Sequence, residues 1–226
     1  MDKQNSLVLE ILRRLSKEGI LDRAMLIGSW GAYFYKYYFK SEDYHPVLKT
    51  RDIDFLLPKP VRFPKKLDLE ALLSDLGFEV EHSREGYMRL ESAELILEML
   101  IPETGAGRDK PYPLPEIKFN AQPLRHLAML WREPINIEIE GISFRIPHPA
   151  DYCIQKLIIQ EKRKDKEKKE KDLESAFSVL EILLQENQTK LIFEVFQKCS
   201  RNEKKVVLDI LIKRGHEELA TQLKNR

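Results

Sequence analysis

The sequence predicts an α/β (α+β) fold with a mixed-sheet core followed by a helical C-terminal region. Short apolar segments separated by turn residues, which are typical of strands, continue up to residue 146. From Pro149 onward, apolar residues recur at helical spacing. A length of 226 residues suits one domain with a smaller second one. We therefore expect an α/β domain at 1–147 and a helical domain at 148–226.

The charge and cysteine content exclude several classes of protein. Lys and Arg number 38 against 37 Asp and Glu, so the formal net charge is +1. This balance argues against a shell that coats duplex DNA electrostatically, and it leaves room for a local phosphate site. No stretch approaches about 18 uninterrupted apolar residues, so no membrane span is expected. Cys153 and Cys199 form no Cys-x-x-Cys motif, which indicates reduced thiols and a cytoplasmic protein.

Hydrophobic periodicity and turn residues predict the elements of the first half of the chain. In order, these are a helix over 6–17, a strand over 23–27, a helix over 30–39, a loop over 40–50, a strand over 51–57, a helix over 69–76 capped by Asp68, and strands over 78–82, 87–91 and 94–101. The helix over 30–39 is expected to bury one aromatic face, made of Trp30, Tyr33, Phe34, Tyr37 and Tyr38.

The second half is predicted in the same way. We expect a loop over 102–115, a short helix from Pro123 to Trp131, a hairpin over 135–146, a helix from Asp151 into the charged run 161–174, and further helices that begin near Asp172, Thr189 and Arg201. The charged run is interpreted as a solvated helix or loop. A nucleic-acid patch there is less favoured, because its acids nearly cancel its bases.

Asp52 and Asp54 lie in an otherwise apolar strand. Because side chains alternate along a strand, both carboxylates point to one face, about 6.6 Å apart along the chain, while Ile53 and Phe55 point to the other. Two like charges on one face are costly to bury unless a cation lies between them. Carboxylate oxygens at this spacing suit Mg²⁺ or Mn²⁺ rather than Zn²⁺. Since a bare Asp-x-Asp is also common on solvated sheet faces, its context matters.

A strand that enters a Gly-Ser turn precedes this acidic strand. Gly28 allows close approach of the backbone to a ligand, and the amides and hydroxyl around Ser29 can bind a phosphate at a helix start. A phosphate-binding turn followed by a strand with paired carboxylates is the layout that metal-assisted phosphoryl transfer needs.

A third carboxylate is expected from the strand over 94–101. Glu98 lies between Leu97 and Met99, where an unpaired carboxylate would be costly to bury, so it is expected to meet a cation or a basic side chain. Glu94 shares this face but lies at the strand edge, which makes it the weaker alternative.

The order of these motifs resembles the nucleotidyltransferase superfamily of DNA polymerase beta type. Within it, the chain is most similar to a group of uncharacterised bacterial nucleotidyltransferase-like proteins. The motifs that carry this similarity are Gly28-Ser29-Trp30, Thr50-Arg51-Asp52-Ile53-Asp54-Phe55, Glu98-Met99-Leu100-Ile101-Pro102, Lys156-Leu157 and Lys171-Asp172. A Lys-then-Asp arrangement also occurs in nucleotidyltransferases of abortive-infection toxin–antitoxin systems.

The resemblance implies a role for each residue of the site. Asp52 and Asp54 would bind two Mg²⁺ (or Mn²⁺) ions, and Glu98 would be the base or a metal ligand at the attacking hydroxyl. Gly28 and Ser29 would hold the phosphates of the NTP.

Arg51 and Lys156 are further candidates for nucleotide binding. Lys156 can reach a triphosphate as a point charge, and a plain surface lysine is an equal alternative. Arg51 either pairs with one of the acids or touches substrate. The insertion at 40–49, relative to the superfamily pattern, is either a lid or a longer loop.

The predicted reaction transfers a nucleoside monophosphate from an NTP to a hydroxyl and releases pyrophosphate. The acceptor is an RNA, a protein or a small molecule, and nothing in the sequence chooses among them. The alternative is a catalytically silent nucleotidyltransferase fold that acts as an antitoxin or adaptor for a partner protein. A sugar transferase with an Asp-x-Asp motif is disfavoured by the Gly-Ser turn.

Overall fold

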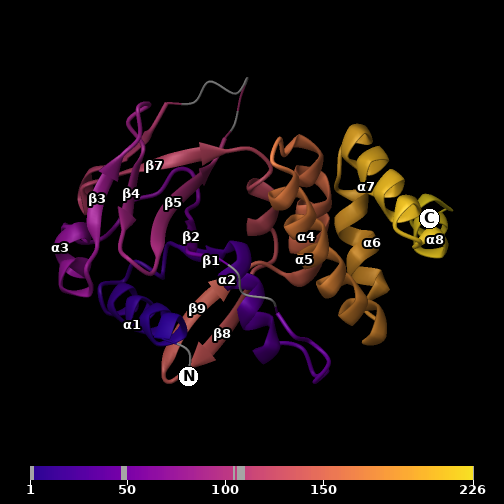
Figure 1. Ribbon diagram of the computed structural model, residues 1–226, viewed down its shortest axis with the longest axis horizontal. Helices are drawn as coiled ribbons and strands as arrows, with labels where there is room; N and C mark the ends of the chain where they lie inside the picture. The colour runs from indigo at the N-terminus through magenta and orange to yellow at the C-terminus, as the bar shows by residue number, and fades with distance from the viewer. Residues whose placement is uncertain (1–2, 47–49, 104, 106–109, 226) are drawn as a thin grey trace. The chain divides into compact units, whose positions relative to one another are not determined.

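The chain folds into two compact units in the computed structural model (Figure 1), which describes residues 3–46, 50–103, 105 and 110–225. The first unit consists of Met1–Phe34 and Leu48–Pro147, and the second of Tyr35–Val47 and His148–Arg226. The mixed sheet belongs to the first unit and the C-terminal helices to the second, which confirms the predicted fold class. The division into domains at 147/148 stays a prediction.

A mixed sheet forms the core of the first unit. Across the described residues its nine strands follow the order β3-β4-β5-β2-β1-β9-β8, with β7 paired to β5 and β6 paired to β7. The bounds are β1 (Met25–Ile27), β2 (Asp52–Leu56), β3 (Glu79–His82), β4 (Met88–Glu91), β5 (Ile96–Pro102), β6 (Tyr112–Leu114), β7 (Phe119–Leu124), β8 (Ile135–Ile139) and β9 (Ile142–Ile146). The pairs β2–β5, β5–β7 and β1–β9 are parallel, and the other pairs are antiparallel.

Three α-helices accompany this sheet in the described part of the first unit: α1 (Lys3–Lys17), α2 (Gly28–Tyr33) and α3 (Leu69–Leu73). Asp68 caps α3 by accepting a hydrogen bond from the Ala71 amide, as predicted. Short 3₁₀ segments lie at Phe34–Tyr37, Ser74–Leu76, Pro115–Ile117 and Ala128–Trp131.

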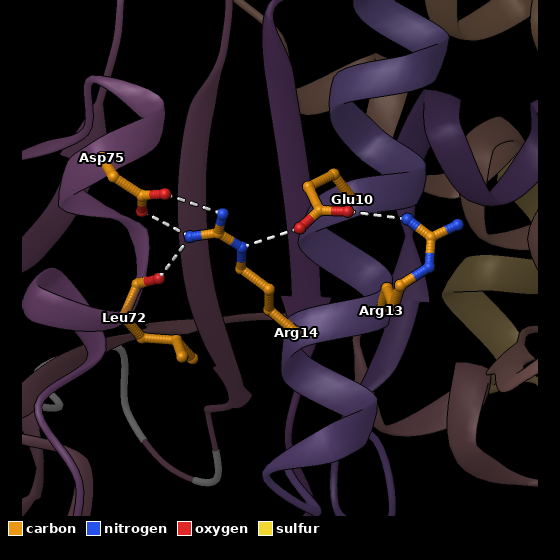
Figure 2. Close-up of polar contacts among 5 residues, drawn as sticks. All are labelled: Glu10, Arg13, Arg14, Leu72 and Asp75. Atoms are coloured by element: carbon orange, nitrogen blue, oxygen red, sulfur yellow. Dashed lines mark hydrogen bonds and ion pairs between the residues drawn. The ribbon is translucent and has the colours of Figure 1, made fainter.

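A polar network holds α1 to the end of α3 (Figure 2). The Arg14 guanidinium donates to Glu10 on its own helix, to both carboxylate oxygens of Asp75, and to the Leu72 carbonyl at 2.9 Å. Arg13 donates to the other oxygen of the Glu10 carboxylate. Because Arg14 bonds both a carboxylate and a late helical carbonyl, it ties two segments that lie about 60 residues apart in the chain.

The second unit is built around α4. Its α-helices are α4 (Pro149–Ile159), α5 (Lys166–Gln185), α6 (Thr189–Gln197), α7 (Arg201–Lys213) and α8 (Glu217–Asn225), with a 3₁₀ turn at Gln160–Lys162. Helix α4 contacts α5, α6 and α7, and these helices are drawn from orange to yellow in Figure 1. The predicted capping box of Ser200 and Glu203 is present at the start of α7.

Two predictions about residues 102–131 are wrong in detail. Residues 119–124 form strand β7, although Pro123 was expected to open a helix. Strand β7 pairs with β5 along one edge and with β6 along the other, but β6 pairs only as far as Ala121. Pro123 therefore has no strand partner on the β6 edge, and a proline, which cannot donate a backbone hydrogen bond, is tolerated there. The predicted loop at 102–115 likewise contains strand β6.

The helix predicted to run from Asp151 through the charged residues is interrupted. Arg163 has an extended backbone, and Asp165 caps a new helix, so α5 begins at Lys166 rather than near Asp172. The Asp165 carboxylate accepts hydrogen bonds from the Glu167 and Lys168 amides, which provides a local reason for the restart.

The aromatic segment after Gly28 is also rearranged. A 3₁₀ turn over Phe34–Tyr37 changes the helical spacing, so Tyr35 is buried and Tyr37 is exposed. Tyr35 contributes to an aromatic cluster of the second unit, with ring contacts to Phe39, Tyr44 and Tyr152. No helix in the described part of the chain is long and apolar enough to cross a membrane.

Candidate active site

The candidate site lies on β1, β2 and β5 in the middle of the sheet. Strand β2 pairs with β1 on one side and with β5 on the other, so Asp54 lies between Ile27 and Glu98 in the register. Residues that are direct register partners project to the same face, with neighbouring strands about 4.8 Å apart. The structure therefore places the Asp54 and Glu98 carboxylates side by side, although they are 44 positions apart in the chain.

Asp52 joins this pair on the same face. It lies two residues before Asp54, opposite Ile96 on β5, and its side chain is exposed, whereas those of Asp54 and Glu98 are half-buried. The intervening Ile53 is fully buried on the other face. One face of β2 thus belongs to the core and the other carries the acids, which is the alternation that the sequence predicts.

Gly28 lies directly against the Asp54 carboxylate. Its φ of +68° is in the left-handed region, and a Cβ atom built on it would collide with the Asp54 Oδ2 atom. Both facts require glycine, since only a residue without a Cβ tolerates this backbone and lets the carboxylate approach it. Ser29 follows in the first turn of α2 and is half-buried.

Arg51 is oriented by the turn between β4 and β5. Its guanidinium donates to the Ser92 carbonyl at 2.7 Å and lies 3.5 Å from a carboxylate oxygen of Glu91. The Asp52 amide bonds the hydroxyl of Thr50 at 3.1 Å, so the entry into the acidic strand is held by local contacts. Glu94, the weaker alternative for the third acid, precedes β5 and forms an ion pair with Lys3 at 2.6 Å.

Lys156 belongs to the second unit and is engaged there. Its Nζ donates to Asp172 Oδ1 at 2.5 Å, and the other oxygen of Asp172 accepts from Arg163 Nε at 2.9 Å. Burial of Lys156 opposes its charge, but the neighbouring Tyr152 and Asp172 outweigh this effect, so the pKa of Lys156 is raised. The Lys-then-Asp motif of the sequence is therefore an ion pair between α4 and α5.

Sequence reasoning missed Arg89 as a neighbour of the site. Arg89 on β4 is the register partner of Glu98 on the side opposite Asp54, and its side chain pairs with Glu91 at 2.9 Å. The signal in the sequence is the alternation of Arg89 and Glu91 about the buried Leu90.

The carboxylates of the site suggest a divalent metal ion. No group of three or more His, Cys, Asp or Glu side chains among the described residues is arranged to hold a metal ion. The available donors nevertheless fit Mg²⁺ or Mn²⁺, because they are carboxylate oxygens only. Asp52, Asp54 and Glu98 are the residues that would hold such ions.

A mixed sheet that brings a Gly-Ser turn, a strand with paired acids and a third acid together defines the nucleotidyltransferase class of fold. A family model described as nucleotidyltransferase matches residues 6–199. The chain belongs to this nucleotidyltransferase family, which confirms the resemblance found in the sequence.

Two solved structures are similar to the chain. One is an antigenic nucleotidyltransferase-like protein from Paracoccidioides brasiliensis, 14% identical, with a TM-score of 0.53; the match covers 99% of this chain and 93% of that one. The other is ANT(2″)-Ia in complex with adenylyl-2″-tobramycin, 16% identical, with a TM-score of 0.46; the match covers 87% of this chain and 99% of that one. The similarity to the Paracoccidioides brasiliensis protein is a similarity of fold. No curated protein matches the sequence.

Proposed function

We propose that the protein is a metal-dependent nucleotidyltransferase that moves a nucleoside monophosphate from an NTP to an acceptor hydroxyl. The observation that carries this proposal is the register of β2 and β5, which aligns Glu98 with Asp54 on the face that also bears Asp52. Membership of the nucleotidyltransferase family supports a transferase activity in general. The identity of the acceptor, whether RNA, protein or small molecule, stays open.

Each residue of the site has a proposed role. Asp52 and Asp54 hold two Mg²⁺ or Mn²⁺ ions, and Gly28 and Ser29 hold the phosphates of the NTP. When bound, the metal ions neutralise the charge that develops on the phosphoryl oxygens. Glu98 orients the acceptor hydroxyl or accepts its proton. Because Gly28 carries no side chain, the Asp54 carboxylate lies directly against the backbone of the Gly-Ser turn, which brings a proposed metal ligand next to the proposed phosphate site.

The atoms of the reaction balance without a further reactant. The acceptor oxygen forms a bond to the α-phosphorus, and the bond from that phosphorus to the bridging oxygen of the β-phosphate breaks. Pyrophosphate leaves, and the hydroxyl proton passes to the Glu98 carboxylate. The protein contributes mainly by positioning these groups.

Arg51 and Lys156 stay predicted nucleotide ligands. The Lys156 ammonium group has three N–H donors, and one of them is engaged by Asp172 at 2.5 Å, so a triphosphate would share this lysine with Asp172. For Arg51, the contact to the Ser92 carbonyl orients the guanidinium and leaves its other nitrogens for a ligand.

Ligand-dependent thermal stability tests the metal and nucleotide site. We expect NTPs with Mg²⁺ or Mn²⁺ to raise the melting temperature of the wild type, and to raise it little in Asp52→Asn/Asp54→Asn, because the metal ligands are lost. Glu94→Gln is the matched control, since it removes a nearby carboxylate that is not a proposed metal ligand. An equal shift in the double variant would show that these residues do not form the site.

Transfer itself is tested with α-labelled NTPs incubated with cell RNA, lysate protein and small molecules. We expect label on one of these acceptor classes with the wild type, and a loss of at least about a hundredfold with Glu98→Gln if it acts as the base. Binding of NTP and metal without transfer to any class would instead favour the silent adaptor.

A further inference from the structure

The charged segment at residues 161–172 presents an uneven surface. It contains seven bases and five acids, which nearly cancel when they are counted along the chain. In the structure, this segment leaves the 3₁₀ turn after α4, passes through Arg163, and enters α5 at Lys166. Every side chain from Glu161 to Lys168 is exposed.

Three of the five acids are already engaged within the second unit. Asp165 caps α5 through the Glu167 and Lys168 amides. Glu170 accepts two hydrogen bonds from Arg214, each at 2.8 Å. Asp172 is buried and accepts from Lys156 and Arg163, as the acid of the ion pair between α4 and α5.

The lysines of the same segment are mostly not engaged. The side-chain ammonium groups of Lys164, Lys166, Lys168 and Lys169 form no ion pair or hydrogen bond with any residue that the structure describes. The first three are exposed, and Lys169 is partly exposed. Residues 164–169 therefore carry four unpaired ammonium groups beside the carboxylates of Asp165 and Glu167, and we call these four residues the lysine cluster.

We propose that the lysine cluster is a binding surface for the phosphate backbone of single-stranded nucleic acid. Lys166 and Lys169 share one face in the first turn of α5, where the helix rises only about 4.5 Å over three residues, whereas Lys168 projects from the side opposite Lys166. A flexible strand can wrap around this turn and reach the lysines on both sides, whereas a duplex is stiff over tens of nanometres and meets only one side. This proposal is independent of nucleotidyl transfer.

The surroundings of the cluster favour nucleic acid over a membrane. Residues 161–172 include no apolar side chain, so nothing there can insert among acyl chains. The Asp165 carboxylate occupies amides at the start of α5, which leaves the lysine side chains as the phosphate contacts. Contacts of this kind depend steeply on salt.

Fluorescence anisotropy with a short labelled single-stranded RNA tests the proposal. With four lysine–phosphate contacts, the logarithm of the binding constant should fall with the logarithm of salt concentration at a slope of about −3. The dissociation constant of the wild type should then rise roughly fiftyfold between about 50 mM and about 200 mM salt. Lys164→Gln/Lys166→Gln/Lys168→Gln should reduce this rise to roughly threefold, because one contact remains.

A matched variant distinguishes the effect of the lysine cluster from the effect of the protein's overall positive charge. Lys190→Gln/Lys205→Gln/Lys213→Gln removes the same three charges from exposed positions on α6 and α7, and should bind RNA as the wild type does. Glutamine has a helix propensity similar to that of lysine, and circular dichroism melts of both variants check their folding. Equal salt slopes in the wild type and the cluster variant would overturn the proposal.

Four further probes decide the kind of partner. Asp52→Asn/Asp54→Asn should bind the RNA like the wild type, and a loss of binding would place the strand at the nucleotide site instead. Equal or tighter binding of duplex RNA would overturn the preference for single strands. Equal binding of a poly-glutamate peptide, or of vesicles rich in phosphatidylserine, would assign the cluster to an acidic protein or a membrane.

Discussion

Gly28 has two roles: its left-handed backbone conformation requires a glycine, and its missing side chain leaves space for the Asp54 carboxylate. Gly28→Ala should destabilise the protein by about 1–2 kcal/mol through its left-handed backbone, which lowers the melting temperature by about 2–8 °C. The new methyl group also forces the Asp54 carboxylate to turn away, so the thermal shift with NTP and Mg²⁺ should be lost. Thermal melts with and without ligand measure both effects.

Gly77→Ala is the matched control for Gly28→Ala, because it also replaces a glycine with a left-handed backbone. It has a φ of +80° at the end of the segment after α3, and a Cβ atom there meets nothing within 4 Å. Gly77→Ala should therefore show a similar loss of stability and keep the ligand-induced shift. If both variants keep the shift, the approach of Gly28 to Asp54 has no role in ligand binding.

At the scale of elements, the network around Arg14 makes the attachment of α1 dependent on pH (Figure 2). Hydrogen bonds from Arg14 lower the pKa of Asp75, and bonds from Arg14 and Arg13 lower that of Glu10. Because both folded-state pKa values lie below the ordinary ones, the stabilisation is present above those ordinary values. It is lost as the pH falls through the lowered values.

Urea denaturation between pH 7 and acid pH measures this dependence. We expect the wild type to lose more stability below about pH 5 than Arg14→Gln, in which the two acids return toward ordinary pKa values. Arg23→Gln removes the same charge from an exposed residue outside this network and should follow the wild type. Parallel curves for the wild type and Arg14→Gln would contradict the role of the network.

Element predictions succeeded where the signal is local. The capping residues Asp68 and Ser200 act as the sequence indicates, because a cap depends on residues within one helical turn. The helix predicted from Pro123 to Trp131 overlaps the end of strand β7, because a proline suits both a helix start and the unpaired side of a strand. Only the pairing of β7 with β5 and β6 distinguishes the two.

At the scale of the whole molecule, the second unit is discontinuous in sequence. Residues 35–47 belong to it together with 148–226, and Tyr35 packs its ring 5.6 Å from that of Tyr152. The predicted helical domain at 148–226 lacks this segment. An aromatic run can pack in either unit and sequence spacing does not say which, so the division at 147/148 stays a prediction.

A shortened chain of residues 148–226 tests the importance of this segment. Without Tyr35, Tyr152 loses a buried aromatic partner, so we expect helical circular dichroism with a broad thermal transition and binding of a hydrophobic dye. The full chain, measured in parallel, should melt in a sharper transition. A sharp melt of the shortened chain without dye binding would show that 148–226 folds on its own.

The amino-acid sequence by itself determined the fold class, the family resemblance and the candidate residues, because alternation, capping and turn chemistry are local properties of the chain. Only the tertiary structure decided that Glu98 rather than Glu94 lies beside Asp54, that Lys156 pairs with Asp172, and which lysines of the charged segment lack a partner. Strand register and ion pairing join residues far apart in the chain, and they follow from the packing of whole elements rather than from local sequence pattern.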